Sequence, residues 1–137
     1  MKTKTLFLCL VISALTLTNC GKKGCTDSNG ENYCSDCKKD DGSCTYKGQV
    51  VLWTKSLSTG ESFDVYLNGS LQGNIGVNFT SAPSCGTTGA LTISKELGKN
   101  KTQNFSFKVY SDSAGIHTDS ATGNILFKAN ACTAYEL

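Results

Sequence analysis

Residues 63–75 read FDVYLNGSLQGNI, and this stretch does most to decide the fold. From Phe63 to Asn68, apolar and more polar side chains alternate, a period of two that is typical of a strand with one buried face. The Asn-Gly pair that ends this alternation is a favoured two-residue hairpin turn. The stretch therefore predicts two antiparallel strands, 63–67 and 70–75, joined by a tight turn.

Short stretches of the same kind recur through residues 48–137, separated by polar turn residues. The further strands that we expect are 49–55, 77–80, 90–94, 105–109, 124–129 and 132–137, with 77–80 either continuing the preceding strand or starting a new one. Residues 98–102 and 111–123 are small and polar, and predict loops. About seven short strands without a convincing helix predict an all-β fold, a small antiparallel β-sandwich of immunoglobulin-like or transthyretin-like kind. Propensity leaves the strand order open.

The apolar positions of these strands predict the hydrophobic core of the sandwich. The candidates are Leu52, Phe63, Val65, Leu67, Leu91, Ile93, Phe105, Phe107, Val109, Ile125 and Phe127. Trp53 is the one tryptophan of the chain. In a domain this small we expect it to be buried at least in part, and an exposed binding role is the alternative.

The N-terminal segment carries a targeting pattern. Lys2 and Lys4 precede an apolar run of about a dozen residues, 6–17, which ends in Leu-Thr-Asn-Cys at Cys20. A membrane-spanning helix needs roughly 20 apolar residues, so a permanent span is not expected. The pattern resembles a bacterial lipoprotein signal with its lipobox. The resemblance implies removal of residues 1–19, acylation of Cys20 and insertion of its acyl chains into a lipid bilayer. An ordinary secretory signal and a cytoplasmic core helix are the alternatives.

The charge of the chain limits the classes of partner that we expect it to bind. All thirteen basic residues are lysines, and eleven remain once Lys2 and Lys4 leave with the signal, facing eleven acids. Nucleic-acid recognition depends on clustered lysine and arginine. A near-neutral chain without arginine is therefore not expected to bind nucleic acid.

The cysteines indicate an oxidising compartment. Of eight cysteines, Cys9 lies in the signal and Cys20 is the expected lipid attachment site, which leaves six. An even number of cysteines in an exported chain favours disulfides. The six are Cys25, Cys34, Cys37, Cys44, Cys85 and Cys132. Cys85 and Cys132 are expected to pair if both lie in the sandwich.

Residues 20–47 form a cysteine module with almost nothing apolar to bury. It contains Gly-Cys-Thr-Asp from residue 24, Asn-Tyr at 32–33 and Asp-Asp-Gly-Ser-Cys ending at Cys44. These residues resemble a short module of exported Bacteroidota proteins, G-C-T-D-x-x-A-x-N-Y-x-x-x-A-x-x-D-D-G-S-C. The resemblance implies a bond between Cys25 and Cys44. Cys34 and Cys37, additional to that pattern, would then pair with each other. The crossed alternative pairs Cys25 with Cys37 and Cys34 with Cys44.

The acids of the cysteine module suggest a calcium site as one alternative. Carboxylate oxygens are ligands that calcium prefers, although their spacing here is not that of an EF-hand. Asp, Asn and Gly are also ordinary turn formers, and we favour that role and expect no cofactor. The candidate ligands are Asp27, Glu31, Asp40 and Asp41.

The sequence offers little for catalysis, and we expect no enzyme. His117 is the one histidine, placed among serines and aspartates of the predicted loop 111–123. Catalytic triads are assembled from distant, rigid elements, so an exposed loop histidine is expected. No P-loop, zinc-protease helix motif or dinucleotide-binding glycine run is present.

Two Asp-Ser-Ala triplets, at Ser113 and Ser120, resemble the O-glycosylation acceptor of Bacteroidota. The residues that follow Cys20 lack the acids of known surface-export signals in that group. We therefore expect an outer-membrane lipoprotein on the periplasmic face.

Two functions remain open. The first is a non-catalytic binding or adhesion module for an envelope protein or a glycan, which would present an exposed aromatic patch such as Trp53, Tyr66 and Tyr110. The alternative is a structural accessory subunit of an envelope complex.

Overall fold

The computed structural model of the chain describes residues 21–137, apart from the side chains of Asp119 and Ser120. The predicted signal peptide, residues 1–19, and the predicted lipid attachment site Cys20 lie outside the described residues. The fold is all-β, as predicted. Its strands are β1 (Lys23–Gly24), β2 (Lys39–Asp40), β3 (Tyr46–Trp53), β4 (Glu61–Leu67), β5 (Ser70–Ile75), β6 (Leu91–Gly98), β7 (Thr102–Ser113), β8 (Ile116–Lys128) and β9 (Cys132–Glu136).

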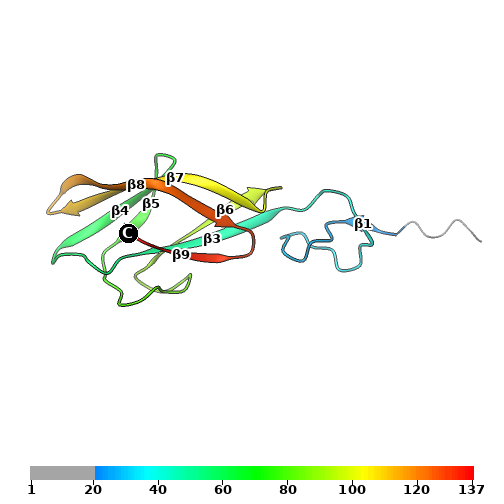
Figure 1. The fold of residues 1–137 in the computed structure, drawn as a ribbon, viewed down its shortest axis with the longest axis horizontal. Helices are drawn as coiled ribbons and strands as arrows, with labels where there is room; N and C mark the ends of the chain where they lie inside the picture. Colours follow the sequence, from blue (N-terminus) through cyan, green and yellow to red (C-terminus); the bar gives the residue numbers. More distant parts are fainter. Residues whose placement is uncertain (1–20) are drawn as a thin grey trace, which may run out of the picture.

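The long strands form two sheets that pack into a sandwich (Figure 1). Sheet I has three strands in the order β6-β3-β9, and sheet II has four in the order β5-β4-β7-β8. An immunoglobulin sandwich instead places its first, second, fifth and fourth strands in one sheet. The observed order is therefore not the immunoglobulin order, which leaves the transthyretin-like alternative. Within these two sheets, neighbouring strands are antiparallel except β3 and β9, which run parallel. The short strands β1 and β2 also pair in parallel.

The core lies between the two sheets and follows the predicted alternation. Leu52, Val65, Leu67, Ile93, Val109, Ile125 and Phe127 are buried, and Phe63, Leu91, Phe105 and Phe107 are partly buried and pack against them. Tyr46, Val50, Ile75 and Leu97 also belong to this core, together with Cys25 and Cys44 of the cysteine module. Phe127 and Phe105 meet edge to face, with ring centroids 5.0 Å apart.

The outer face of sheet I is covered by the segment 76–90. The Cys85–Cys132 disulfide ties this segment to β9, and Gly86 N donates to Thr92 Oγ1 at 2.7 Å. Val51 and Trp53 are consequently buried, so β3 is covered on both faces. The prediction that Trp53 belongs to the interior is confirmed, and its alternative as an exposed binding aromatic is wrong.

The predicted strand 77–80 is not a strand, because this part of the chain leaves the sheet after β5. The side chain of Asn78 instead bonds to the backbone of Leu57. Its Oδ1 accepts from Leu57 N at 2.6 Å and its Nδ2 donates to Leu57 O at 3.0 Å. The side chain therefore pins the covering segment to the loop that follows β3.

The prediction of a loop at residues 111–123 is wrong, because these residues belong to the long β7–β8 hairpin. The ladder runs to the Ser113–Ile116 pair and turns at Ala114 and Gly115, whose φ angles of 52° and 80° suit a two-residue hairpin turn. Residues 113–118, at the tip of this hairpin, carry mostly small and polar side chains and are exposed. Backbone pairing rather than burial therefore holds them, and the apolar alternation that marks other strands is missing.

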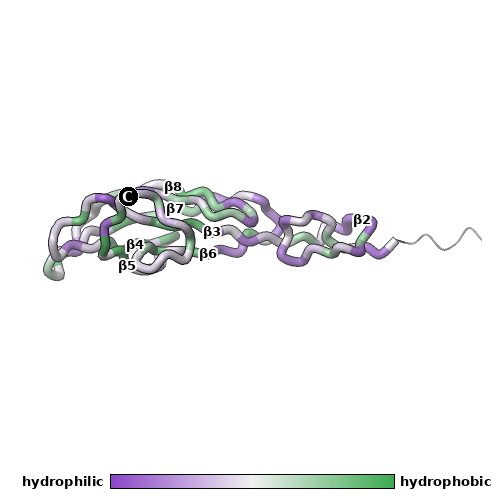
Figure 2. The backbone as a smooth tube through the Cα atoms, turned by 90° about the horizontal axis from the view of Figure 1, so that it is seen from below, coloured by the Kyte–Doolittle hydropathy of each residue, from purple (hydrophilic) through white to green (hydrophobic). Residues whose placement is uncertain are grey.

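The cysteine module extends from one end of the sandwich (Figure 1). It contains Cys25–Cys44 and Cys34–Cys37 disulfides, so the predicted pairings are present and the crossed alternative is not. Hydrophilic residues dominate the module, whereas hydrophobic residues recur along the sandwich strands (Figure 2). Strand β3 begins at Tyr46, inside the range predicted for the module. Residues 21–137 contain no helix that is long and apolar enough to cross a bilayer.

Candidate functional site

A hollow of about 360 Å³ opens on the outer face of sheet II. We call it the tyrosine hollow. Unlike the outer face of sheet I, this face has no disulfide-bound covering segment. The hollow is lined by Tyr66, Gly69, Lys108, Tyr110 and His117, contributed by β4, the β4–β5 turn, β7 and β8.

Strand register brings the two tyrosines together. Tyr66 lies opposite Lys108, and Asp64 lies opposite Tyr110, so the tyrosines are diagonal neighbours on one face. Their rings meet edge to face with centroids 5.4 Å apart. The Lys108 ammonium lies 4.5 Å from the centre of the Tyr110 ring, a cation–π contact. The hollow thus combines aromatic surface with a cation.

His117 forms the other part of this face, in strand β8 rather than in the expected loop. Its Nδ1 lies 3.8 Å from Asp64 Oδ2, and its Nε2 lies 3.5 Å from Asp112 Oδ2. Asp112 pairs with His117 across the β7–β8 ladder, and Asp64 comes from β4. Three adjacent strands therefore supply one histidine–aspartate cluster, which consists of Asp64, Asp112 and His117.

Both aspartates of this cluster are held by a second hydrogen bond. Asp64 Oδ1 accepts from Asn74 Nδ2 at 3.0 Å. Asp112 Oδ1 accepts from Gly115 N, also at 3.0 Å. The Oδ2 atom of each carboxylate is left facing the imidazole. Among the side chains that the structure describes, this is the group of His, Cys, Asp or Glu close enough to share a metal ion.

The structure separates the predicted aromatic patch. Tyr66 and Tyr110 lie side by side, but Trp53 is buried on the outer face of sheet I beneath the segment 76–90. Sequence reasoning missed the partnership of His117 with the two aspartates. Asp64 and Tyr66 lie on the same face of β4, as period two requires. Asp112 and His117 could be placed only once 111–123 was known to be a hairpin.

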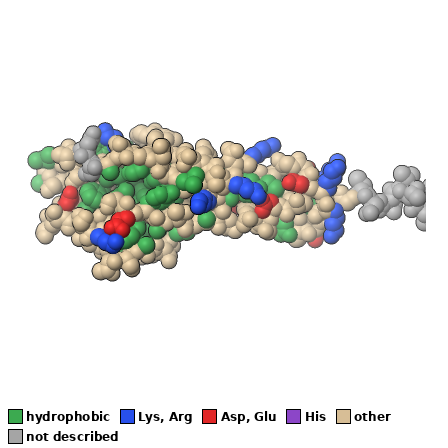
Figure 3. All heavy atoms as spheres, in the orientation of Figure 1, with side chains coloured by type: hydrophobic (Ala, Val, Ile, Leu, Met, Phe, Trp, Pro, Cys, Tyr) green, Lys and Arg blue, Asp and Glu red, His purple; other side chains and the backbone are tan. Residues whose placement is uncertain are grey.

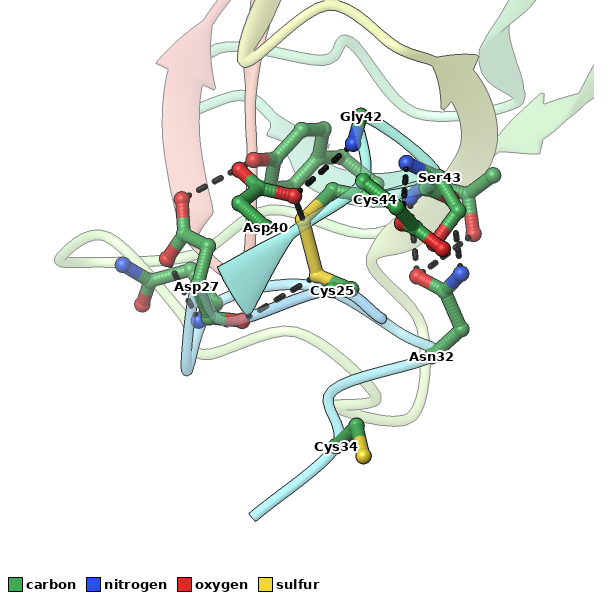
Figure 4. The surroundings of a disulfide bond; sticks show 12 residues. Cys25, Asp27, Asn32, Cys34, Asp40, Gly42, Ser43 and Cys44 are labelled. Carbon is green, nitrogen blue, oxygen red and sulfur yellow. Dashed lines mark hydrogen bonds between the residues drawn. A yellow bond between two sulfur atoms is a disulfide. The ribbon is translucent and has the colours of Figure 1, made fainter. Parts of the chain in front are cut away.

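The acids of the cysteine module serve its turns, as Figure 4 shows around Cys25–Cys44. Asp40 accepts from Gly42 N at 2.9 Å, and Asp41 accepts from Ser43 N at 3.0 Å, each two residues further on. These are Asx turns, the role that we favoured. The four predicted calcium ligands Asp27, Glu31, Asp40 and Asp41 are not gathered into a close group of three. Calcium binding there stays an untested alternative to the expectation of no cofactor.

Asp27 joins the module to the sandwich. Its Oδ2 accepts from Lys101 Nζ at 2.6 Å and from the Tyr46 hydroxyl at 2.9 Å, while its Oδ1 accepts from Asn29 N. Lys101, Asn29 and Tyr46 hold the pKa of Asp27 well below its ordinary value. Asp27 in turn raises the pKa values of Tyr46 and Lys101. The joint therefore keeps its charges throughout the neutral range.

The predicted glycosylation sites lie in strands rather than in a loop. Ser113 is exposed at the end of β7, beside the hairpin turn, and Ser120 lies in β8 with its side chain outside the described part. Glycosylation of either residue stays a prediction.

No protein-family model matches the sequence, and neither a curated protein nor a solved structure matches the chain. Function is therefore inferred from the chemistry of the molecule itself.

Proposed function

We propose that the protein is a non-catalytic, membrane-anchored binding module of the cell envelope, which holds a glycan in the tyrosine hollow. Acyl chains on Cys20 anchor it to the outer membrane, on the periplasmic face. The observation that carries the proposal is the hollow itself, where two tyrosine rings and a lysine meet on an uncovered sheet face.

The chemistry of the hollow suits a sugar. Tyrosine rings offer apolar surface to the C–H groups of a pyranose while their hydroxyls still form hydrogen bonds. The Lys108 ammonium adds a hydrogen-bond donor to the lining of the hollow. Binding sites commonly combine aromatic walls with a few polar groups of this kind.

Among the described side chains, the contacts of His117 are with carboxylates rather than with a nucleophile. Its two ring nitrogens face the carboxylates of Asp64 and Asp112. Nucleophilic catalysis would need a hydroxyl or thiol within hydrogen-bond reach of the imidazole. The cysteines that remain after Cys20 are paired in disulfides, so none of them offers a thiolate.

The shape of the molecule supports a tethered display. The β7–β8 hairpin turn lies at the end of the sandwich opposite the cysteine module (Figure 1). Exposed lysines gather at the far end of the module, next to the start of the described chain (Figure 3). They are Lys22, Lys23, Lys38 and Lys39. A basic surface beside an acyl anchor favours contact with anionic lipid headgroups. The module would thus face the bilayer while the sandwich faces away from it.

Substituting both tyrosines tests the proposal. We expect the full chain carrying Tyr66→Ala and Tyr110→Ala to bind envelope glycans at least tenfold more weakly than the wild type. Tenfold corresponds to about 1.4 kcal/mol, a modest loss for two aromatic contacts. Binding would be measured on immobilised envelope polysaccharide. Tyr33→Ala is the matched control, because Tyr33 is 48% exposed and belongs to the cysteine module.

Two results would contradict the proposal. One is glycan binding that the double substitution leaves unchanged. The other is recovery of a single stoichiometric protein from solubilised envelope by both the wild type and the double variant. That second result would favour the structural accessory role instead.

A further inference from the structure

The histidine–aspartate cluster has the composition of a metal site. Asp64, Asp112 and His117 each offer a ligating atom, and these atoms all lie within 4.8 Å of one another. With metal–ligand bonds of about 2.1 Å in a tetrahedral arrangement, neighbouring ligand atoms lie about 3.4 Å apart. The observed 3.5 Å between His117 Nε2 and Asp112 Oδ2 is already close to this spacing.

We propose that Asp64, Asp112 and His117 bind one divalent transition-metal ion, with Zn²⁺ as the cation that the ligand set fits best. One imidazole nitrogen and one oxygen from each carboxylate coordinate the ion. His117 is half exposed, so its ring can turn to bring the chosen nitrogen closer to Asp64. The site is separate from the glycan-binding residues Tyr66 and Tyr110, and the metal needs no sugar in order to bind.

The ligand types select a transition metal over calcium. Calcium takes six to eight oxygen ligands, whereas this cluster supplies two carboxylates and a nitrogen. Imidazole suits zinc, copper, iron and nickel, and carboxylates are also common zinc ligands. The two carboxylates give this cluster an excess of negative charge, which a divalent cation would compensate.

The surroundings prepare the carboxylates for this role. Metal-ligating carboxylates are themselves hydrogen-bonded in established sites, which fixes their orientation. Here Asn74 holds one oxygen of Asp64 and the Gly115 amide holds one oxygen of Asp112, with the other oxygen of each directed at His117. The ligands stand on three neighbouring strands of one sheet, and backbone pairing fixes the register between those strands.

Three protein ligands leave the coordination of the ion incomplete. Zinc sites with three protein ligands keep a position for water or another ligand. His117 also lines the tyrosine hollow, so that open position lies at the border of the hollow. A bound ion would therefore be able to coordinate an oxygen atom of a molecule held in the hollow.

Titration of the full chain with Zn²⁺ alone tests the site. After dialysis against a chelator, calorimetry at neutral pH should show one saturable zinc ion per chain, and Co²⁺ should give the visible absorption of a bound ion. His117→Ala should abolish both signals, because the chain has no second histidine. Asp64→Asn and Asp112→Asn should each weaken zinc binding at least tenfold. Asn74→Ala should weaken it about tenfold, as is typical when a supporting hydrogen bond is lost.

Asp36→Asn is the control for charge, since it removes one exposed carboxylate from the cysteine module. It should leave zinc binding unchanged, and Ca²⁺ should not compete. Near-UV circular dichroism in chelator checks that each variant is folded. Absence of zinc binding by the folded wild type would overturn the proposal, and so would zinc binding that survives His117→Ala. Neither result depends on a glycan, so the metal site and the proposed function can fail separately.

Discussion

Replacing Cys85 and Cys132 together with serine is expected to lower the free energy of unfolding by about 4 kcal/mol, from the loop-closure entropy of the unfolded chain. The disulfide joins residues 47 apart in sequence, the longest loop of the three. It also fixes the segment 76–90 over the outer face of sheet I, where Trp53 is only 4% exposed. Because Trp53 is the one tryptophan, its fluorescence in a denaturant titration reports the unfolding of this region.

The control for this prediction is the double substitution Cys34→Ser and Cys37→Ser. That disulfide spans residues only 3 apart and lies within the cysteine module. We expect the Trp53 transition to move little in this variant. In the Cys85/Cys132 variant, by contrast, the native fluorescence should also shift toward that of a solvent-exposed indole. Equal transition midpoints in the two variants would show that the long disulfide does not stabilise the sandwich.

Phe127→Ala is expected to destabilise the sandwich by about 3–5 kcal/mol, the range for removing a buried aromatic ring from a packed core. Phe127 is fully buried, comes from β8 and packs against Phe105 of β7. Its removal leaves a cavity between the sheets that the neighbouring strands cannot fill. The change would be measured as the shift of the denaturant midpoint at constant slope.

Leu71→Ala is the matched control for the core. Leu71 is 56% exposed on edge strand β5, so its truncation should change stability by no more than about 0.5 kcal/mol. If the two substitutions cost the same, Phe127 is not a central part of the core.

The β4–β5 hairpin was predictable because its two strands and its turn follow one another directly in the sequence. Strand 70–75 was predicted with the observed bounds, and β4 starts two residues before its predicted start at Phe63. Asn68 and Gly69 have positive φ angles of 47° and 81°, as their turn type requires. The same alternation identified the inward side chains of β4, β6, β7 and β8.

The features of the fold that the sequence could not show depend on pairing between distant segments. The parallel alignment of β3 with β9 joins residues far apart in the chain, and no local pattern encodes it. Residues 111–123 carry no apolar alternation, and residues 113–118 at the tip of that hairpin are exposed. The burial of Trp53 depends on a covering segment that a disulfide holds in place.

The candidate site, likewise, was predictable from the sequence only in part. Tyr66 and Tyr110 were recognised as aromatics available for binding, and the structure brings them into contact. The approach of His117 to Asp64 requires the register of three strands at once, β4, β7 and β8. A prediction that treated His117 as a loop residue therefore had no means of finding its partners.

Export with anchoring at Cys20 is the claim on which the proposed location and the oxidised cysteines depend. Intact-mass spectrometry of the protein recovered from cells tests it most directly. We expect a chain that lacks residues 1–19, carries acyl groups on Cys20 and has no free thiol among its six other cysteines. A mass that retains Met1, with no lipid and all eight cysteines reduced, would contradict the account.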